Sequence, residues 1–277
     1  MRPLPGRLVL LGHPVAHSLS PRMHNAALQA IGSDLRYEAI DVAPEALDAL
    51  LDALIAEGAA GNVTIPHKTR VADRCASLTS RARRAGAVNV FWIEAGALAG
   101  DNTDIPAFAW LVEQTLGSLP QDARIAMLGA GGAAKAALAA IEQWDGCSVT
   151  LYSRTRQHAE SLASRFAVVD RIAASPREAV ASAWLVVNAT PLGLREGDPM
   201  PVDPECLGAH SAVIDLVYRE GGTEWARAAL AAGHRARDGI GMLLEQGALA
   251  FEQWMGVAAP RQVMHEALVR RASGSAP

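Results

Sequence analysis

The order of apolar runs along this chain constrains its fold more than any other feature. Runs of strand length at residues 8–11, 36–42 and 61–65 alternate with two amphipathic stretches of helical period. Strands that alternate with helices in this way pair in parallel, because each helix carries the chain back along the sheet. The first third of the sequence therefore predicts an α/β layer.

Local signals place the two helices of this layer. The first is predicted over residues 21–31, with Ser20 as its N-cap, Pro21 at its first position and Gly32 just beyond its end. The core-facing side of the second helix consists of Leu47, Leu50, Leu51, Leu54 and Ile55. Both helices are expected to pack against the sheet.

A hairpin and a second alternating series follow. Residues 88–93, a turn at 94–96 and a return strand to Gly100 form the predicted hairpin. Residues 115–123 contain glycine, serine, proline and other polar residues and mark the entry to the second unit. The strands of this unit are predicted at 124–128, 148–152, 185–188 and 212–217, with helices between them.

The composition argues against a nucleic-acid-binding, disulfide-rich or zinc-binding protein. The chain has 277 residues, 50% of them hydrophobic, and a formal net charge of −4, so it can bury one or two cores and has no overall basic field for nucleic acid. The three cysteines, Cys75, Cys147 and Cys206, lack the spacing of a disulfide framework or a zinc site. The run at 8–11 is too short for the core of a signal peptide. We expect a cytoplasmic protein that binds neither nucleic acid nor membrane.

The second series opens with a strand that leads into a glycine-rich turn. The turn reads Gly129-Ala130-Gly131-Gly132-Ala133, and an alanine-rich helix follows it. Glycines let the backbone approach a pyrophosphate, and the helix N-terminus offers free N–H groups and the positive end of its dipole. The spacing is not the strict dinucleotide fingerprint, so a simple packing turn between strand and helix is the alternative.

The end of the next strand indicates which dinucleotide would bind. An NAD site calls for Asp or Glu there, to accept the ribose 2′-hydroxyl. This chain has Tyr152-Ser153-Arg154-Thr155-Arg156 instead. Arg154 suits a 2′-phosphate, which predicts NADP, whereas Arg156 is either a second contact or merely solvated.

The scarcity of lysine draws attention to position 68. The chain contains two lysines among its 25 lysine and arginine residues, and Lys68 ends the segment that begins at Asn62. Arginine does not release its proton in a protein, whereas a lysine ammonium can exchange one with a substrate. Lys68 is therefore a candidate proton-transfer group, with a chance surface lysine as the alternative. Lys135, the other lysine, is predicted to be a surface charge.

Together these segments resemble the shikimate dehydrogenase family from about residue 8 to residue 254. The matching motifs are Gly12-His13-Pro14, His17 through His24, Asn62 through Lys68, Gly86-Ala87-Val88-Asn89, Asn102-Thr103-Asp104, the glycine-rich turn, Arg154-Thr155, Asn188 through Gly193, Asp215 through Tyr218, and Gly239-Ile240-Gly241-Met242 with Gln246. The resemblance implies a two-domain α/β fold. Residues 1–104 would form the α/β substrate-binding domain, completed by returning C-terminal helices at 239–277, and residues 105–238 a Rossmann-like NADP-binding domain.

The resemblance also implies an activity and the residues that perform it. The reaction is the reversible, NADPH-dependent reduction of 3-dehydroshikimate to shikimate in aromatic amino acid biosynthesis, with Lys68 and Asp104 carrying proton transfer. The implied substrate-binding residues are Ser18, Ser20, Thr64, Asn89, Tyr218 and Gln246. The implied cofactor-binding residues are Gly129, Ala130, Gly131, Gly132, Ala133, Ser153, Arg154, Thr155, Thr190, Gly239 and Met242.

Several of these side chains also have a local explanation. Ser20 is accounted for as an N-cap, Thr64 by strand propensity and Asp104 as the cap of the helix that follows it. Asn89 is harder to dismiss, because asparagine is depleted from strands unless its amide is used. The local pattern predicts that Gln246 lies on the solvent-exposed face of a helix, so its role rests on the resemblance alone.

Histidines are concentrated in the first quarter of the chain, at His13, His17, His24 and His67. A metal site would need several of them aligned on one element. Pro14 and Pro66 interrupt the helices that would align them, and hydride transfer to NADP needs no metal. No metal site is predicted.

Three departures from the family pattern keep other functions open. Ile105-Pro106-Ala107 stands where the family usually has glycines, Val90 where threonine is common and Ser153 where asparagine is usual. A quinate/shikimate or aminoshikimate dehydrogenase that prefers NAD is one alternative. A non-catalytic sensor of a pathway metabolite is another, and the sequence leaves the oligomeric state open, with a homodimer as one candidate.

Overall fold

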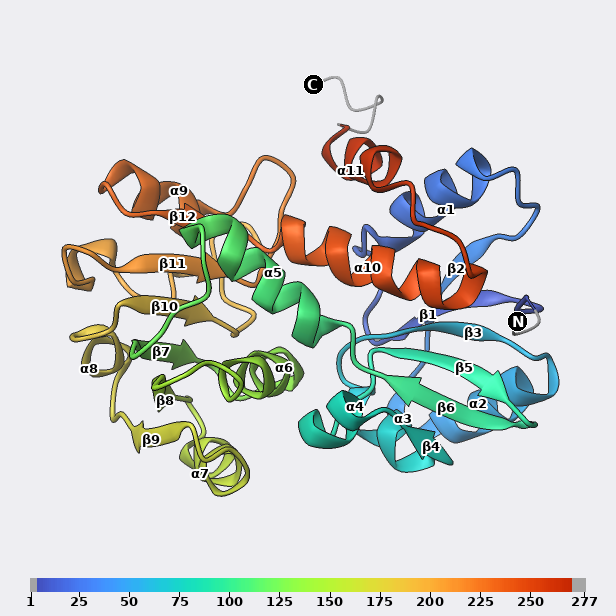
Figure 1. The fold of residues 1–277 in the computed structure, drawn as a ribbon, viewed down its shortest axis with the longest axis horizontal. Coiled ribbons are helices and arrows are strands. Elements are labelled where there is room, and N and C mark those ends of the chain that lie inside the picture. Colours follow the sequence, from blue (N-terminus) through green and yellow to red (C-terminus); the bar gives the residue numbers. More distant parts are fainter. Residues whose placement is uncertain (1–3, 271–277) are drawn as a thin grey trace. The chain divides into compact units, whose positions relative to one another are not determined.

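A computed structural model describes residues 4–270 and divides the chain into two compact units (Figure 1). The first unit runs to Thr103 and resumes at Leu243, and the second spans Asp104–Met242. Each unit is built around its own six-stranded sheet. In the described part of the chain, every helix is too short or too polar to cross a membrane.

The sheet of the first unit has the strand order β2-β1-β3-β5-β6-β4. Its strands are β1 (Leu8–Gly12), β2 (Tyr37–Asp41), β3 (Ala60–Val63), β4 (Ser77–Leu78), β5 (Val90–Glu94) and β6 (Ala97–Asp101). β1 pairs in parallel with β2 and β3, whereas β5 and β6 form an antiparallel hairpin. The hairpin turns at Ala95 and Gly96, both with positive φ, and confirms the one predicted from the sequence.

The helices of the first unit are α1 (Ser20–Ala30), α2 (Leu47–Ala56) with the short 3-10 turn η1 (Pro44–Ala46) before it, α3 (Lys68–Arg74), α4 (Ser80–Ala85), α10 (Ile240–Met255) from Leu243 onward, and α11 (Arg261–Val269). The predicted stripe of α2 is confirmed, since Leu47, Leu51 and Leu54 are fully buried in the same core as Val9 and Phe91. C-terminal α11 packs beside N-terminal α1 (Figure 1). The end of the chain therefore completes a unit that its beginning starts.

The second unit is a parallel sheet of order β12-β11-β10-β7-β8-β9. Its strands are β7 (Arg124–Leu128), β8 (Ser148–Tyr152), β9 (Val169–Ile172), β10 (Leu185–Asn188), β11 (Ala212–Asp215) and β12 (Ala236–Arg237). Its helices are α5 (Asp104–Leu116), α6 (Gly132–Ile141), α7 (Arg156–Arg165), α8 (Pro176–Val180) and α9 (Glu224–Ala231), with the 3-10 turn η2 (Pro204–Cys206). This is the doubly wound order of dinucleotide-binding folds, and it confirms the predicted fold class.

The strand order of the second unit fixes where a ligand can bind. The chain moves from β7 outward to β8 and β9, then returns to place β10 on the other side of β7. Loops leave β7 and β10 in opposite directions at this switch, which opens a crevice at the carboxyl ends of the strands. The glycine-rich turn after β7 lies at this point.

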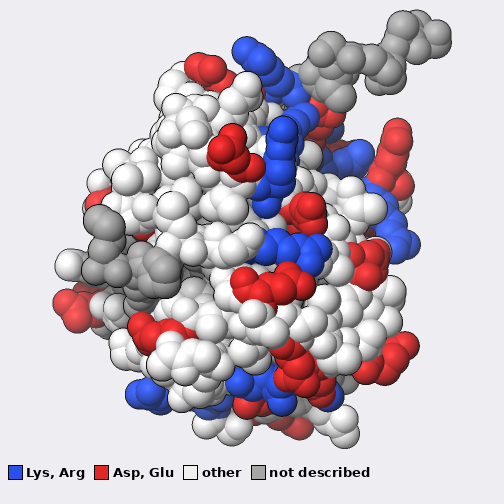
Figure 2. Space-filling model, turned by 90° about the vertical axis from the view of Figure 1, so that its right-hand side faces the viewer, with Lys and Arg blue, Asp and Glu red and all other residues white. Residues whose placement is uncertain are grey.

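Charged side chains are intermixed on the surface. On the face shown in Figure 2, basic and acidic side chains of the described residues lie next to one another. Several arginines are held in ion pairs, such as Arg261 with Glu245 and Glu252.

Candidate active site

The loops that follow β1 and β3 lie against each other because these strands are neighbours in the sheet. The Thr64 N–H donates to the Leu11 carbonyl at 2.8 Å, and the His13 N–H donates to the Ile65 carbonyl at 3.0 Å. A Cβ at Gly12 would lie 2.5 Å from Cγ2 of Thr64, so the close approach requires glycine. Thr64, a predicted substrate residue, therefore adjoins the loop that leads into α1.

Ser18 and Ser20 stand at the start of α1, but the predicted N-cap is wrong. The helix begins at Ser20, Leu19 occupies the N-cap position, and no side chain caps the helix. The Oγ of Ser18 accepts a hydrogen bond from the Ser20 N–H at 3.2 Å. Two hydroxyls thus lie at the N-terminus of an eleven-residue helix, whose dipole favours an anion such as a carboxylate.

Lys68 is the first residue of α3 and is half-buried. Its carbonyl accepts a hydrogen bond from the Val88 N–H at 2.9 Å. This bond ties the backbone of Lys68 to the residue immediately before Asn89. The position of the lysine backbone is therefore set by its contact with the segment that leads into β5.

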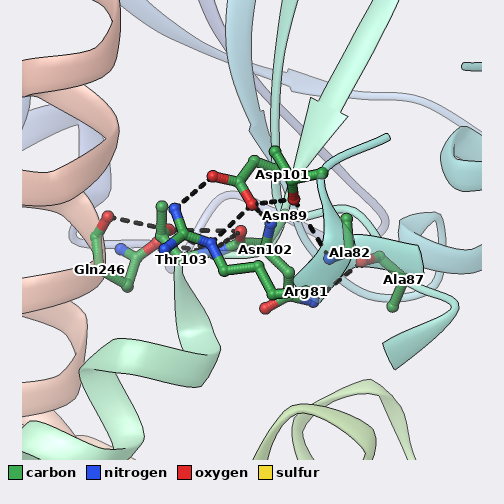
Figure 3. Close-up of polar contacts among 9 residues, drawn as sticks. Arg81, Ala82, Ala87, Asn89, Asp101, Asn102, Thr103 and Gln246 are labelled. Atoms are coloured by element: carbon green, nitrogen blue, oxygen red, sulfur yellow. Dashed lines mark hydrogen bonds and ion pairs between the residues drawn. The ribbon is translucent and has the colours of Figure 1, made fainter. Parts of the chain in front are cut away.

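Asn89, Thr103 and Gln246 form a buried polar network (Figure 3). The Nδ2 of Asn89 donates to the Thr103 hydroxyl at 3.0 Å and to Oε1 of Gln246 at 3.3 Å, and its Oδ1 accepts from the Thr103 N–H at 2.7 Å. The Thr103 hydroxyl also lies 3.0 Å from the Gln246 carbonyl oxygen. The structure thus joins two predicted substrate residues through a third residue that was not predicted.

The segment before Asp104 is anchored at each residue. Asp101 is buried and accepts hydrogen bonds from the guanidinium of Arg81 (Figure 3). It also accepts one from the hydroxyl of Thr79. Burial raises the pKa of Asp101, but the bonds from Arg81 and Thr79 outweigh it and hold the pKa below its ordinary value. Asn102 donates to the Ala87 carbonyl at 2.9 Å. Asp104 follows as the first residue of α5 and is buried.

Three histidines of the first unit make contacts that hold the fold. The Nε2 of His67 lies 2.8 Å from the Val42 carbonyl oxygen, and Nδ1 of His13 lies 2.5 Å from Oδ1 of Asp41. His24 is fully buried and stacks on Tyr37 at a centroid distance of 4.3 Å, and burial lowers its pKa to about 3. Among residues 4–270, no group of three or more His, Cys, Asp or Glu side chains is arranged to hold a metal ion.

The glycine-rich turn of the second unit has the geometry that close backbone approach requires. Gly129 has a φ of 110°, and a Cβ there would lie 2.6 Å from the Ala189 carbonyl oxygen. Gly131 is the N-cap of α6, and a Cβ added to it would meet no atom within 4 Å. The turn Gly129–Ala133 therefore presents open space beside the first N–H groups of a ten-residue helix.

The predicted residues after β8 lie in the loop between β8, the strand next to β7, and α7. Arg154 is exposed, Ser153 is half-buried, and Thr155 is the N-cap of α7. The side chain of Arg156 pairs with Glu160 at 2.9 Å, one turn along α7. Arg154 is thus the better placed of the two for a phosphate at the carboxyl edge of the sheet.

A buried amide and a buried carboxylate organise the other side of the crevice. Asn188 and Asp215 face each other in the register of β10 and β11, and Nδ2 of Asn188 donates to Oδ1 of Asp215 at 2.8 Å. The Oδ1 of Asn188 accepts from the Thr190 N–H at 3.0 Å and its hydroxyl at 2.6 Å. Asp215 in turn accepts from the Val217 N–H at 3.1 Å. The pair therefore fixes both loops that leave these strands.

The segment that follows β12 contacts the loop after β11. The Gly239 N–H donates to the Val217 carbonyl at 2.9 Å, and a Cβ at Gly239 would lie 2.4 Å from the Leu216 carbonyl oxygen. Tyr218 is half-buried in this loop, and Met242 is buried in the first turn of α10. Tyr218 and Gly239 are thus brought to one edge of the sheet.

Comparison with known proteins identifies the family of this chain. The family model described as the shikimate dehydrogenase substrate binding domain matches residues 10–91, and that of the shikimate 5'-dehydrogenase C-terminal domain matches residues 239–269. A shikimate dehydrogenase (NADP(+)) of Symbiobacterium thermophilum is 40% identical, over 98% of this chain and 96% of its own. The chain belongs to the shikimate dehydrogenase family.

Two solved structures are similar to this chain over most of its length. The shikimate 5-dehydrogenase of Thermus thermophilus, in complex with NADP(H) and shikimate, has a TM-score of 0.85 and 37% identity and covers 95% of this chain and 98% of its own. A quinate dehydrogenase of Corynebacterium glutamicum in complex with NAD has a TM-score of 0.83 and 30% identity, with coverages of 94% and 97%. The family and the fold predicted from the sequence are confirmed.

Sequence reasoning gave no role to Thr103, Asn188 and Asp215, which form hydrogen bonds with predicted residues or with one another. Each belongs to a matching motif, but none was assigned a role. A signal was present for two of them, because Asn188 and Asp215 are polar residues that end apolar strands. The hydrogen bonds between them depend on strand pairing, which the sequence does not reveal.

Proposed function

We propose that this chain catalyses the reversible, NADP-dependent interconversion of 3-dehydroshikimate and shikimate. The observation that carries the proposal is the 40% identity, over nearly the full length of both chains, to a shikimate dehydrogenase (NADP(+)). The Thermus thermophilus relative, bound to NADP(H) and shikimate, supports the same substrate and cofactor. The reaction belongs to aromatic amino acid biosynthesis.

Lys68 is the proposed proton donor. When bound, NADPH supplies a hydride to the ring carbonyl carbon, and negative charge develops on the carbonyl oxygen. The Lys68 ammonium stabilises this charge and transfers a proton to the oxygen, and the neutral amine takes the proton back during alcohol oxidation. Asp104, buried at the start of α5, is proposed to accept a hydrogen bond from a ring hydroxyl.

The substrate carboxylate has a suitable binding place at the start of α1. Ser18 and Ser20 are proposed to hold it, supported by their hydroxyls beside the helix N-terminus. Because the chain carries a net charge of −4, local donors must attract this anion without help from the overall field. Thr64, Asn89, Tyr218 and Gln246 are proposed to contact the ring.

The second unit fits NADP. The open space at Gly131 and the N-terminal amides of α6 suit the pyrophosphate, and the exposed Arg154 suits the 2′-phosphate. Ser153, Thr155, Thr190, Gly239 and Met242 complete the proposed cofactor-binding set. We accordingly propose residues 105–238 as the NADP-binding domain, and residues 1–104 with 239–277 as the substrate-binding domain.

Location and assembly are further proposals. The three cysteines are free thiols, which supports a reducing, cytoplasmic location. A homodimer stays a prediction that light scattering of the purified protein would test.

The activity is tested by a substrate panel. Purified protein is incubated with shikimate or quinate and with NADP⁺ or NAD⁺, and formation of reduced cofactor is followed by absorbance. The highest kcat/KM is expected for shikimate with NADP⁺. A preference for quinate with NAD⁺ would favour the second candidate, supported by the quinate dehydrogenase neighbour. Calorimetric binding of shikimate without turnover would instead indicate a metabolite sensor.

The role of Lys68 is tested by Lys68→Arg, which keeps the charge but removes the exchangeable proton. We expect turnover to fall ~100-fold or more with much of the shikimate affinity retained, which is the usual effect of losing a general acid. Lys135→Arg is the matched control, because it makes the same change at the other lysine. Near-normal turnover of Lys68→Arg would contradict the proton-transfer role.

A further inference from the structure

We propose that Thr103 is a positioning residue whose hydroxyl sets the amide groups of Asn89 and Gln246 for binding the substrate ring. This inference rests on the proposed function and adds a residue to its site. Thr103 is fully buried, and it contacts two segments that lie 14 and 143 residues away in the sequence.

The chemistry of the hydroxyl determines the direction of each hydrogen bond. The Gln246 carbonyl oxygen, at 3.0 Å, can only accept, so the single hydroxyl hydrogen of Thr103 points to it in preference to Oδ1 of Asn89 at 3.3 Å. The oxygen of the hydroxyl then accepts from Nδ2 of Asn89 at 3.0 Å. One hydroxyl therefore links the residue before β5 to α10.

These bonds leave the Asn89 amide one orientation. Its Nδ2 faces two acceptors, the Thr103 hydroxyl and Oε1 of Gln246, while its Oδ1 faces a donor, the Thr103 N–H at 2.7 Å. A rotated amide would set its nitrogen against the N–H and its oxygen against acceptors. The Asn89 side chain is thus oriented before substrate arrives.

Gln246 is held in the same way. Its Oε1 accepts from Asn89 at 3.3 Å, and one hydrogen of Nε2 goes to the Leu243 carbonyl at 2.9 Å, within α10. The bond from Thr103 to the Gln246 carbonyl fixes this turn of α10 against the segment 101–103, which Arg81 and Ala87 anchor (Figure 3). Preorganised polar groups lower the cost of ordering a site when ligand binds.

The test compares Thr103→Val, which replaces the hydroxyl with a methyl group of similar size, and Thr103→Ser, which restores the hydroxyl. We expect Thr103→Val to lower kcat/KM for shikimate by ~10-fold or more, mainly through KM, because a buried donor and a buried acceptor each lose a partner. The KM for NADP⁺ should stay within ~2-fold, and Thr103→Ser should recover most of the loss. Thr115→Val is the matched control, since the Thr115 hydroxyl donates to the Leu111 carbonyl within its own helix.

The outcomes separate the two proposals. A wild-type protein that does not oxidise shikimate contradicts the proposed function. If the wild type is active but Thr103→Val keeps its kcat/KM for shikimate, only the positioning role is contradicted. Equal losses for Thr103→Val and Thr103→Ser, or an equal rise in KM for both ligands, would likewise contradict it by showing a general structural effect.

Discussion

Asp215 makes the stability of this protein depend on pH in a specific way. The side chain is fully buried at the end of β11. Burial raises the pKa of Asp215 from 3.8 to about 6. The nearby carboxylate of Asp238 adds to this increase, whereas hydrogen bonds from Thr223, Asn188 and the Val217 N–H oppose it. The folded protein therefore keeps a proton on Asp215 at pH values where the unfolded chain has lost it.

The sign and size of the effect follow from this difference. Stability from the retained proton is fully present below pH 3.8 and is lost as the pH rises through about 6. At about 1.4 kcal/mol per pKa unit, the displacement corresponds to ~3 kcal/mol in the free energy of unfolding. Asp215→Asn removes the titration, while its side-chain oxygen can still accept from Asn188 and Val217.

The assay measures urea unfolding of the wild type and of Asp215→Asn between pH 4 and pH 7. Relative to the wild type, the free energy of unfolding of the variant should rise by about 2 kcal/mol across this interval, because the full ~3 kcal/mol is reached only below pH 3.8. Asp170→Asn, at an exposed position of β9, is the control and should show no such trend. A variant-to-wild-type difference that stays constant from pH 4 to pH 7 would refute the reasoning.

Two further predictions concern the cofactor-binding residues. Gly129→Ala should lower the free energy of unfolding by ~2 kcal/mol and raise the KM for NADP⁺, because the position has a φ of 110° and the added Cβ would lie 2.6 Å from the Ala189 carbonyl oxygen. Gly131→Ala is the control, because its methyl group would meet nothing within 4 Å, and its free energy of unfolding in chemical denaturation should equal that of the wild type. Equal destabilisation by the two substitutions would argue against the steric explanation. Arg154→Ser should lower kcat/KM with NADP⁺ by ~10- to 100-fold and leave the value with NAD⁺ nearly unchanged, as expected for loss of a charge-assisted phosphate contact. Equal losses with the two cofactors in steady-state kinetics would rule out a 2′-phosphate contact at Arg154.

The sequence predicted the elements whose signals are local. The hairpin at 88–100 and the turn after β7 could be read directly, because apolar strands and glycines lie next to one another in the chain. β9 was missed, since its Val-Asp-Arg-Ile sequence is short and half polar. The sequence predicted Ser20 as the N-cap of α1 from residue type alone. In the structure the Ser20 N–H donates to Oγ of Ser18, a contact that residue type does not predict.

The site was predicted less completely than the fold, and Gln246 shows why. Its local pattern suggested a solvent-facing position, yet it is 9% exposed and bonded to Asn89 and Thr103. Its burial results from the return of α10 to the first unit, which no local pattern records.

The α/β class and the glycine-rich turn could be predicted from short segments, because side-chain period and glycine spacing are local properties. The candidate proton-transfer lysine came from the composition of the whole chain. Which polar groups meet depends on the folded arrangement of distant segments. Asn188 bonds to Asp215 through strand register, and Thr103 bonds to Asn89 and Gln246 across 14 and 143 residues. Such contacts form because buried polar groups must find partners wherever folding brings them together.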